Sequence, residues 1–203
     1  MFGTNTRPAF YNLLKTIMKI IALGASSSRK SINKELATYA ATQFSGAQVE
    51  VVDINHFPLP MFSVDLEQEQ GQQQHAARFT EKLAEADLLI VSLAEHNGSY
   101  TAAFKNLFDW ASRVKLRLFE GPKMWLLSAA TGKGGGKAVM ESAVQRFPKH
   151  GAEIICTFSF PEFYVNYLPA KGIVDENLKI EFNNQVDSIR EELLSISEEI
   201  DSQ

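Results

Sequence analysis

Residues 87–110 read DLLIVSLAEHNGSYTAAFKNLFDW, and this stretch decides the fold class. It opens with a continuous apolar run, which is typical of a strand buried on both faces of a parallel sheet. A polar loop follows, and then Phe104, Leu107 and Phe108 recur at the spacing of one helix face. The stretch therefore predicts a strand, a loop and a helix, with Phe104, Phe108 and Trp110 in the core.

The same unit repeats along the chain. Further strands are predicted over 19–24, 48–54, 122–129 and 152–160. Helices are predicted over 32–44, 102–114, 136–147 and 175–200, and over a segment that begins in the Gln-rich tract 67–75 and continues to 86. Strands that alternate with helices predict an α/β fold, an open five-stranded parallel sheet with helices on both faces. In such sheets ligands bind at the carboxyl ends of the strands.

Composition narrows the class of protein. The chain has 203 residues, of which 45% are apolar and 22% charged, as in an ordinary globular protein. A net charge of −4 without a long basic run argues against a nucleic-acid partner. The single cysteine, Cys156, forms no internal disulfide, which suits a reducing compartment, and we expect it in the core of a buried strand.

The amino-terminal region resembles a leader only weakly. The apolar run Ile20–Ala25 is shorter than the roughly 7–15 residues of a secretory signal, and no run approaches the ~20 apolar residues of a membrane span. We therefore expect a cytoplasmic protein with no membrane partner. Residues 1–17 are expected to be an N-terminal extension, either a disordered arm or residues upstream of a start at Met18, and residues 18–203 a single domain.

The loop after the first strand is rich in hydroxyls. Ser26, Ser27, Ser28, Ser31 and Asn33 lie within eight residues at a helix start. Hydroxyls and unpaired N–H groups at a helix N-terminus form an anion site. Because no G-x-G-x-x-G motif is present, a single terminal phosphate suits this loop better than a dinucleotide pyrophosphate. The alternative is that Ser31 caps the helix and no ligand is involved.

The other two loops carry glycines. TGKGGGK (131–137) resembles a phosphate-binding P-loop, but Thr131 stands where the first glycine should be and Ala138 where a hydroxyl should hold Mg²⁺. Its glycines more naturally let the backbone approach a flat ring. Asn97-Gly98 is a turn signal that turns backbone amides toward a ligand. His96 beside it is an acid/base group, a neighbour of a bound ring, or only an exposed loop residue.

Three motifs together resemble the NAD(P)H-dependent FMN reductase family of flavodoxin-like proteins, which includes quinone, azo and chromate reductases. Residues 25–33 (ASSSRKSIN) are similar to its G-S-x-R-x-x-S-x-N, residues 94–110 to its P-E-Y-N-G-S-x-P-G-x-L-K-N-A-I-D-W, and residues 130–136 to its S-P-G-x-x-G-G. The second motif is the specific one. Ala25 and Ser28 depart from the first motif, where the family has Gly and Arg, and His96 replaces a tyrosine in the second.

The resemblance implies a flavodoxin-like three-layer sandwich that binds FMN non-covalently. It places the FMN phosphate on Ser26, Ser28, Ser31 and Asn33, and the isoalloxazine ring against Glu95, His96, Asn97, Gly98, Ser99, Ala130, Thr131 and Gly132. No side chain is required as a nucleophile and no metal ligand is implied. NADPH or NADH would reduce the flavin, which would pass electrons to a small acceptor such as a quinone, free flavin or azo compound. The family also implies a homodimer or a dimer of dimers.

Ser28 weakens this expectation at one point. An arginine there would form a bidentate, charge-assisted pair with the phosphate, so its loss lowers phosphate affinity unless Arg29 substitutes. Four alternatives stay open beside the reductase. They are an electron carrier like flavodoxin, a flavin-dependent sensor, a nucleotide-triphosphate binder, and a flavodoxin-like domain that has lost its cofactor, which the departures at Ala25 and Ser28 keep open.

Overall fold

A computed structural model describes residues 18–201, and its centre is a five-stranded sheet in the order β2-β1-β3-β6-β7. The strands are β1 (Lys19–Ala25), β2 (Gln48–Asp53), β3 (Leu88–Leu93), β6 (Lys123–Ala129) and β7 (Glu153–Phe160). All neighbouring pairs are parallel. The predicted parallel sheet is confirmed, and its carboxyl ends share one edge.

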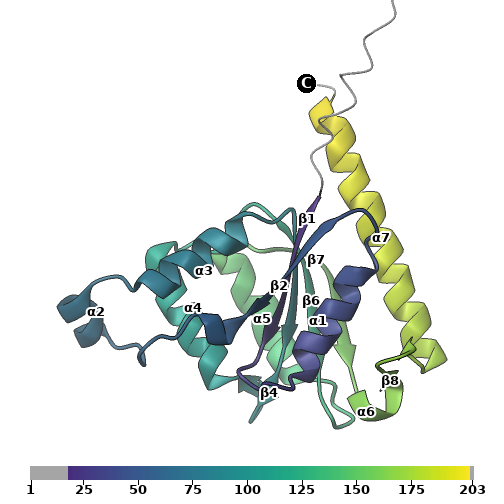
Figure 1. The fold of residues 1–203 in the computed structure, drawn as a ribbon, viewed down its shortest axis with the longest axis horizontal. Helices are drawn as coiled ribbons and strands as arrows, with labels where there is room; N and C mark the ends of the chain where they lie inside the picture. Colours follow the sequence, from purple (N-terminus) through teal and green to yellow (C-terminus); the bar gives the residue numbers. More distant parts are fainter. Residues whose placement is uncertain (1–17, 202–203) are drawn as a thin grey trace, which may run out of the picture.

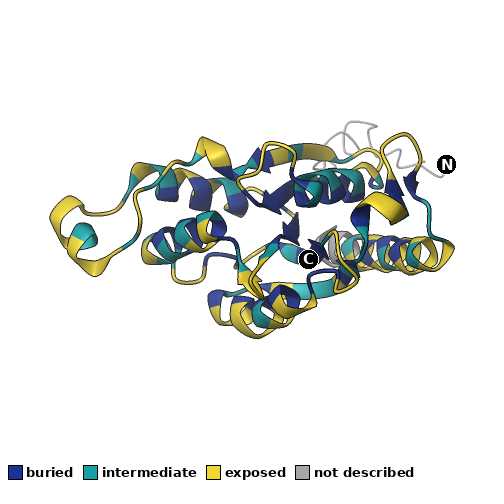
Figure 2. Ribbon diagram, turned by 90° about the horizontal axis from the view of Figure 1, so that it is seen from below, coloured by how far each residue is buried: buried dark blue, intermediate teal, exposed yellow. Residues whose placement is uncertain are grey.

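Helices cover both faces of this sheet (Figure 1). One face carries α1 (Ile32–Thr42) and α7 (Glu176–Asp201), and the other carries α3 (Gln74–Ala84), α4 (Ala102–Val114) and α5 (Lys137–Arg146). Figure 2 shows the buried strands between two layers whose outer surfaces are exposed. This arrangement is the expected flavodoxin-like three-layer sandwich.

Alternation along the central strands supplies both cores. In β1, Ile21 and Leu23 face the cluster under α3, α4 and α5, whereas Ile20 and Ala22 face the cluster under α1 and α7. Successive strand side chains point to opposite faces, so an uninterrupted apolar run is what a doubly covered strand requires. Phe104, Phe108 and Trp110 are buried as predicted, all at or below 4% exposure.

The Gln-rich tract differs from its prediction. It does not begin one long helix: α2 (Val64–Gln70) ends at Gly71, whose φ of 71° lies in the left-handed region, and α3 starts afresh at Gln74. Glycine adopts that conformation without steric cost, so it ends the first helix. In Figure 1, α2 and the loop segments on either side of it project away from the body of the molecule.

Several short elements had no clear sequence signal. They are the 3₁₀ helices Ile54–His56 and Phe147–His150, the helix α6 (Phe163–Asn166), and the antiparallel pairs β4 (Glu95–His96) with β5 (Ser99–Tyr100) and β8 (Tyr167–Leu168) with β9 (Gly172–Ile173).

The prediction for Cys156 is also wrong in part. It lies on the edge strand β7 and is only partly buried, and that burial raises the pKa of its thiol.

The predicted extension, residues 1–17, lies outside the described residues. Between residues 18 and 201, no helix is both long and apolar enough to cross a bilayer.

Candidate functional site

Three loops meet at the carboxyl edge of the sheet. They follow β1, β3 and β6, which are neighbours in the sheet, and span residues 26–31, 94–101 and 130–136. All twelve residues predicted to bind a ligand lie on these loops or, for Asn33, in the first turn of α1. The fold therefore brings them together at the edge where ligands of such sheets bind.

The first loop presents hydroxyls at the start of α1. Ser31 caps the helix, since its Oγ accepts the N–H of Lys34 at 3.1 Å, and Ser26 Oγ accepts the N–H of Ser28 at 3.2 Å. A hydroxyl that accepts one bond still has its own hydrogen to donate. The capping role of Ser31 is thus confirmed without excluding an anion, because both hydroxyls retain a donor at the positive end of the helix.

Charge near this loop is divided unequally. The ammonium of Lys34 is paired with Asp53 at 2.8 Å. Arg29 and Lys30 are exposed and form no ion pair within residues 18–201. These two side chains are therefore the cations that remain free to meet an anion beside Ser26, Ser28 and Ser31.

Asn33 connects the start of α1 to two neighbouring strands. Its side-chain Oδ1 accepts the Ser92 hydroxyl at 2.7 Å and the N–H of Ala129 at 2.8 Å, and its Nδ2 donates to the Ala129 carbonyl at 3.0 Å. The residue is only 2% exposed. Asn33 thus ties the start of α1 to the ends of β3 and β6, and its predicted contact with a phosphate stays a prediction.

The second loop is a tight hairpin rather than an irregular loop. β4 and β5 are joined by Asn97 and Gly98, whose φ values of 52° and 74° are those of a type I′ turn. His96, Asn97, Gly98 and Ser99 are all exposed. Thr101 then caps α4 as the sequence suggested, and its hydroxyl donates to the carbonyl of Ala25 at 3.0 Å.

The carboxylate of Glu95 connects this hairpin to the helix that follows the third loop. Its Oε2 accepts the N–H of Val139, in the first turn of α5, at 3.0 Å. An anion that accepts from a first-turn amide stabilises a helix start. The Glu95 carboxylate is thus held by α5 through one of its two oxygens.

The glycines of the third loop serve two purposes. Gly135 and Gly136 have φ of 61° and 78°, and a Cβ on Gly136 would lie 2.9 Å from Ser128 Cβ, whose hydroxyl donates to the Gly135 carbonyl at 2.8 Å. These two positions need glycine for the loop to fold. A Cβ on Gly132 or Gly134 would meet nothing within 4 Å, so only these two leave open space beside the backbone.

Sequence reasoning missed the support from the loop after β2. Asn55 Nδ2 donates to the Ser27 carbonyl at 3.2 Å, and Asp53 Oδ1 accepts the Asn55 N–H at 2.9 Å. The signal was present as Asp53-x-Asn55, because an aspartate that bonds the amide two residues on forms an Asx turn. In the region covered by the structure, no cluster of His, Cys, Asp and Glu could hold a metal ion.

Asp53 makes the stability of this support depend on pH. Burial raises the pKa of its carboxyl, but the hydrogen bonds from Lys34 and Asn55 outweigh burial and lower the pKa overall. A lowered pKa stabilises the fold above the unfolded pKa of about 4 and loses that contribution as pH falls through the folded value. Asp53→Asn should therefore cost about 1 kcal/mol at pH 7, and the difference from the unmodified chain should shrink at lower pH.

Urea unfolding at several pH values measures this difference. Asp187→Asn is the matched control, because Asp187 belongs to an exposed pair with Arg190, and exposed pairs contribute little. A cost for Asp53→Asn that stays the same at pH 3 and pH 7 would contradict the assignment.

The chain is similar in sequence to a known protein family. The family model for NADPH-dependent FMN reductase matches residues 18–163. The chain is 32% identical over 135 residues to an NADPH:quinone oxidoreductase of Arabidopsis thaliana, covering 62% of this chain and 64% of that protein. It is 35% identical over 97 residues to a 2-hydroxy-1,4-benzoquinone reductase of a Burkholderia species, covering 47% of this chain and 51% of that protein.

A solved structure shares the fold. The flavoenzyme NAD(P)H:(acceptor) oxidoreductase FerB of Paracoccus denitrificans superposes with a TM-score of 0.68 at 19% identity, covering 88% of this chain and 98% of that one. The plant relatives are matched over somewhat less than two thirds of their length, 64% and 63%. The family model spans all three motifs, and the chain belongs to the NADPH-dependent FMN reductase family.

Proposed function

We propose that the chain is an FMN-dependent NAD(P)H oxidoreductase that passes electrons from a nicotinamide to a quinone, free flavin, azo compound or similar small acceptor. The observation that carries the proposal is the rim itself. The three loops follow adjacent strands, and hydrogen bonds of Asn33 to β6, of Glu95 to α5 and of Thr101 to the end of β1 connect the segments that flank them. Such a preformed edge suits a ligand that contacts all three loops at once.

The residues present fit the phosphate of FMN. The hydroxyls of Ser26 and Ser31 each keep a hydrogen to donate, and Ser28 between them is exposed. The positive end of the α1 helix dipole faces the same loop. Arg29 is free to supply positive charge. A monoester phosphate needs donors and a cation, and this loop offers both.

The second and third loops fit the ring. The hairpin residues 96–99 and residues 131–134 are exposed, and Gly132 and Gly134 leave space beside the backbone for a flat group. FMN, when bound there, would supply the hydride acceptance and electron transfer that the chain's own residues lack. The two loops would orient the ring and offer backbone amides to its edge.

His96 has a proposed second part. It is exposed on the hairpin, opposite Ser99, beside the place proposed for the ring. Histidine is a common general acid in enzymes, which suits it for protonation of a quinone oxygen during reduction. A homodimer, in which the second chain borders the same space, is proposed on the family resemblance.

The visible spectrum of the purified protein tests the proposal. After incubation with FMN and desalting, the retained flavin band should bleach anaerobically on addition of NADPH or NADH and return on addition of a quinone. A flavin that is retained but bleached by neither nicotinamide would identify a carrier or sensor instead. Failure to retain any flavin would contradict the proposal at its first step.

Ser28 gives a prediction in the direction of gain. Ser28→Arg restores a bidentate cation beside Ser26 and Ser31, so we expect FMN to bind about tenfold more tightly at low salt. Quenching of FMN fluorescence during titration measures the dissociation constant. Gln145→Arg adds the same charge at an exposed position of α5, outside the three loops, and it should not tighten binding. Equal gains from both variants would show only a general effect of charge.

A further inference from the structure

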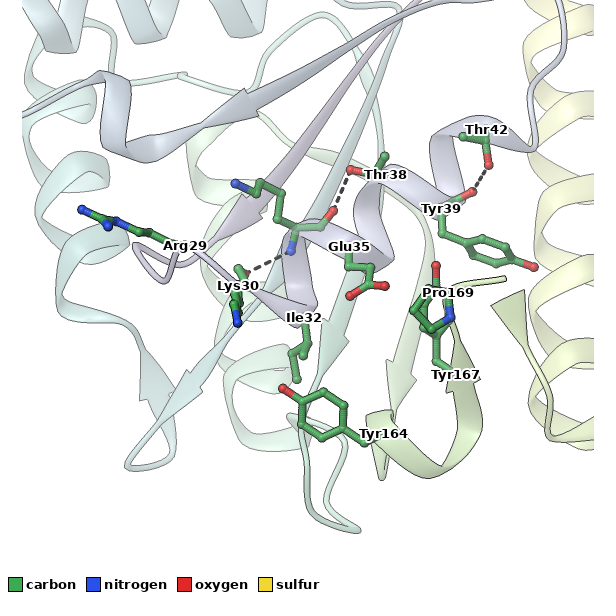
Figure 3. Close-up of a pocket in the computed structure, with 12 residues that line it drawn as sticks. Arg29, Lys30, Ile32, Glu35, Thr38, Tyr39, Thr42, Tyr164, Tyr167 and Pro169 are labelled. Atoms are coloured by element: carbon green, nitrogen blue, oxygen red, sulfur yellow. Dashed lines mark hydrogen bonds between the residues drawn. The ribbon is translucent and has the colours of Figure 1, made fainter. Parts of the chain in front are cut away.

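A second cavity begins at the first loop and leads away from the proposed ring site. It has a volume of ≈690 Å³ and lies between α1 and the segment formed by α6 and β8 (Figure 3). Arg29 and Lys30 lie at one end, Ile32 and Glu35 in the middle, and Tyr39 at the far end. The cavity is thus charged where it meets the first loop and becomes aromatic along its length.

The aromatic part of the cleft is already formed. The Tyr39 ring packs edge-on against the Tyr167 ring, with 5.5 Å between the ring centroids, and its centroid lies 5.3 Å from that of the Phe182 ring. A Cβ on Gly172 would lie 2.5 Å from the same ring, so the β8–β9 turn packs directly on it. Tyr164, by contrast, is 69% exposed and lies beside Ile32 (Figure 3). A fixed aromatic floor with one exposed ring is suited to stacking a planar base.

Glu35 is the one carboxylate among the residues that line the cleft. In the part of the chain that the structure describes, its carboxylate makes no hydrogen bond or ion pair. Its negative charge acts on the cleft residue Tyr167. The pKa of the Tyr167 hydroxyl is raised mainly by burial and, to a smaller extent, by the charge of Glu35. A carboxylate in this position can only accept hydrogen bonds, so it favours a ligand with hydroxyl or amino donors.

We infer that this cleft binds the adenosine 5′-phosphate half of the nicotinamide co-substrate. The phosphate would lie toward Lys30, the ribose hydroxyls on Glu35 and the adenine against Tyr164. A carboxylate that accepts the ribose 2′-hydroxyl is a general means of binding such nucleotides. This inference rests on the proposed function and deepens it.

The cleft lies within reach of the proposed ring site. The N–H of Phe163 donates to the Ala130 carbonyl at 3.1 Å, and the N–H of Glu162 donates to the Gly132 carbonyl at 3.1 Å. Tyr164 therefore directly follows a residue bonded to the loop proposed to border the flavin. A dinucleotide with its nicotinamide over that loop can lay its adenosine into the cleft.

Glu35 should then bias the choice of nicotinamide. A 2′-phosphate on the ribose would face the Glu35 carboxylate, and two negative groups in contact repel each other. The carboxylate thus disfavours NADPH relative to NADH. Glu35→Gln removes the charge and keeps the shape, and it should raise the ratio of kcat/KM for NADPH to that for NADH by about tenfold.

Binding of adenosine 5′-monophosphate to the FMN-loaded protein tests the cleft without any turnover. Calorimetry should detect binding, and Tyr164→Ala should weaken it about tenfold because one stacking partner is lost. Lys149→Ala, an exposed cation on the other face of the sheet, is the matched control and should change nothing. No binding, or binding only to flavin-free protein and reversed by FMN, would place the nucleotide elsewhere and overturn the inference.

The kinetic outcomes separate this inference from the proposed function. If the unmodified protein bleaches its flavin normally and Glu35→Gln leaves the NADPH-to-NADH ratio unchanged, the assignment of the cleft is wrong and the oxidoreductase stands. If neither nicotinamide bleaches the retained flavin, both are wrong. In each variant, FMN affinity is measured separately and should stay unchanged.

Discussion

Replacing Asn33 with alanine is expected to lower the free energy of unfolding by about 3 kcal/mol and to weaken FMN binding at the same time. The side chain makes three hydrogen bonds at 2% exposure, to the Ser92 hydroxyl and to both backbone groups of Ala129. Alanine leaves these groups buried without partners, which costs more than the net value of the bonds themselves. The loops after β1 and β6 would also lose their direct connection.

Urea unfolding and FMN titration measure the two effects. Asn55→Ala is the matched control, because Asn55 also bonds the first loop, at the Ser27 carbonyl, but is exposed. Its unfolding free energy should change by less than about 1 kcal/mol. If Asn33→Ala and Asn55→Ala cost the same, Asn33 does not connect the loops in the way we describe.

The sheet and the order of its elements follow from sequence pattern. β3 and β6 consist mainly of apolar residues because both of their faces are covered, and this pattern can be recognised without knowledge of contacts. The helix caps Ser31 and Thr101 were also predictable from local sequence. Each residue directly precedes its helix, and its hydroxyl accepts the N–H of the residue three positions later.

The connections within the site could not be read in this way. Asn33 meets Ala129 across 96 residues and Glu95 meets Val139 across 44, and no local periodicity encodes such pairs. The predicted contacts of Asn33 and Glu95 with FMN stay predictions, and the sequence did not reveal that these side chains also bond Ala129 and Val139. The hairpin could be predicted in part. Asn97-Gly98 is the strongest short signal for a type I′ turn, but the two-residue strands beside it are too short to show alternation.

The substitution Gly24→Ala should also have a large effect. We expect it to lower the free energy of unfolding by about 2–3 kcal/mol and to weaken FMN binding. A Cβ on Gly24 would lie 2.5 Å from both the backbone N and the Cα of Lys34, closer than real Cβ atoms approach. Alanine in a strand should otherwise gain about 0.4–1 kcal/mol by restricting the unfolded chain. The clash is the larger effect, because backbone atoms of α1 cannot move aside as a flexible side chain would.

The same contact sets the position of the proposed phosphate loop. Gly24 lets the start of α1 lie directly on the end of β1, so residues 26–31 must turn tightly between them. Gly134→Ala is the control: its Cβ meets nothing within 4 Å and its φ is not positive, so stability should stay within about 0.5 kcal/mol. Thermal or urea unfolding of both variants, with FMN titration of Gly24→Ala, decides the matter. If Gly24→Ala is as stable as Gly134→Ala and its FMN affinity is unchanged, α1 can move away from β1 without a cost in free energy. The hydroxyls of the phosphate loop, rather than the close contact between the backbones of β1 and α1, would then determine the conformation of the loop.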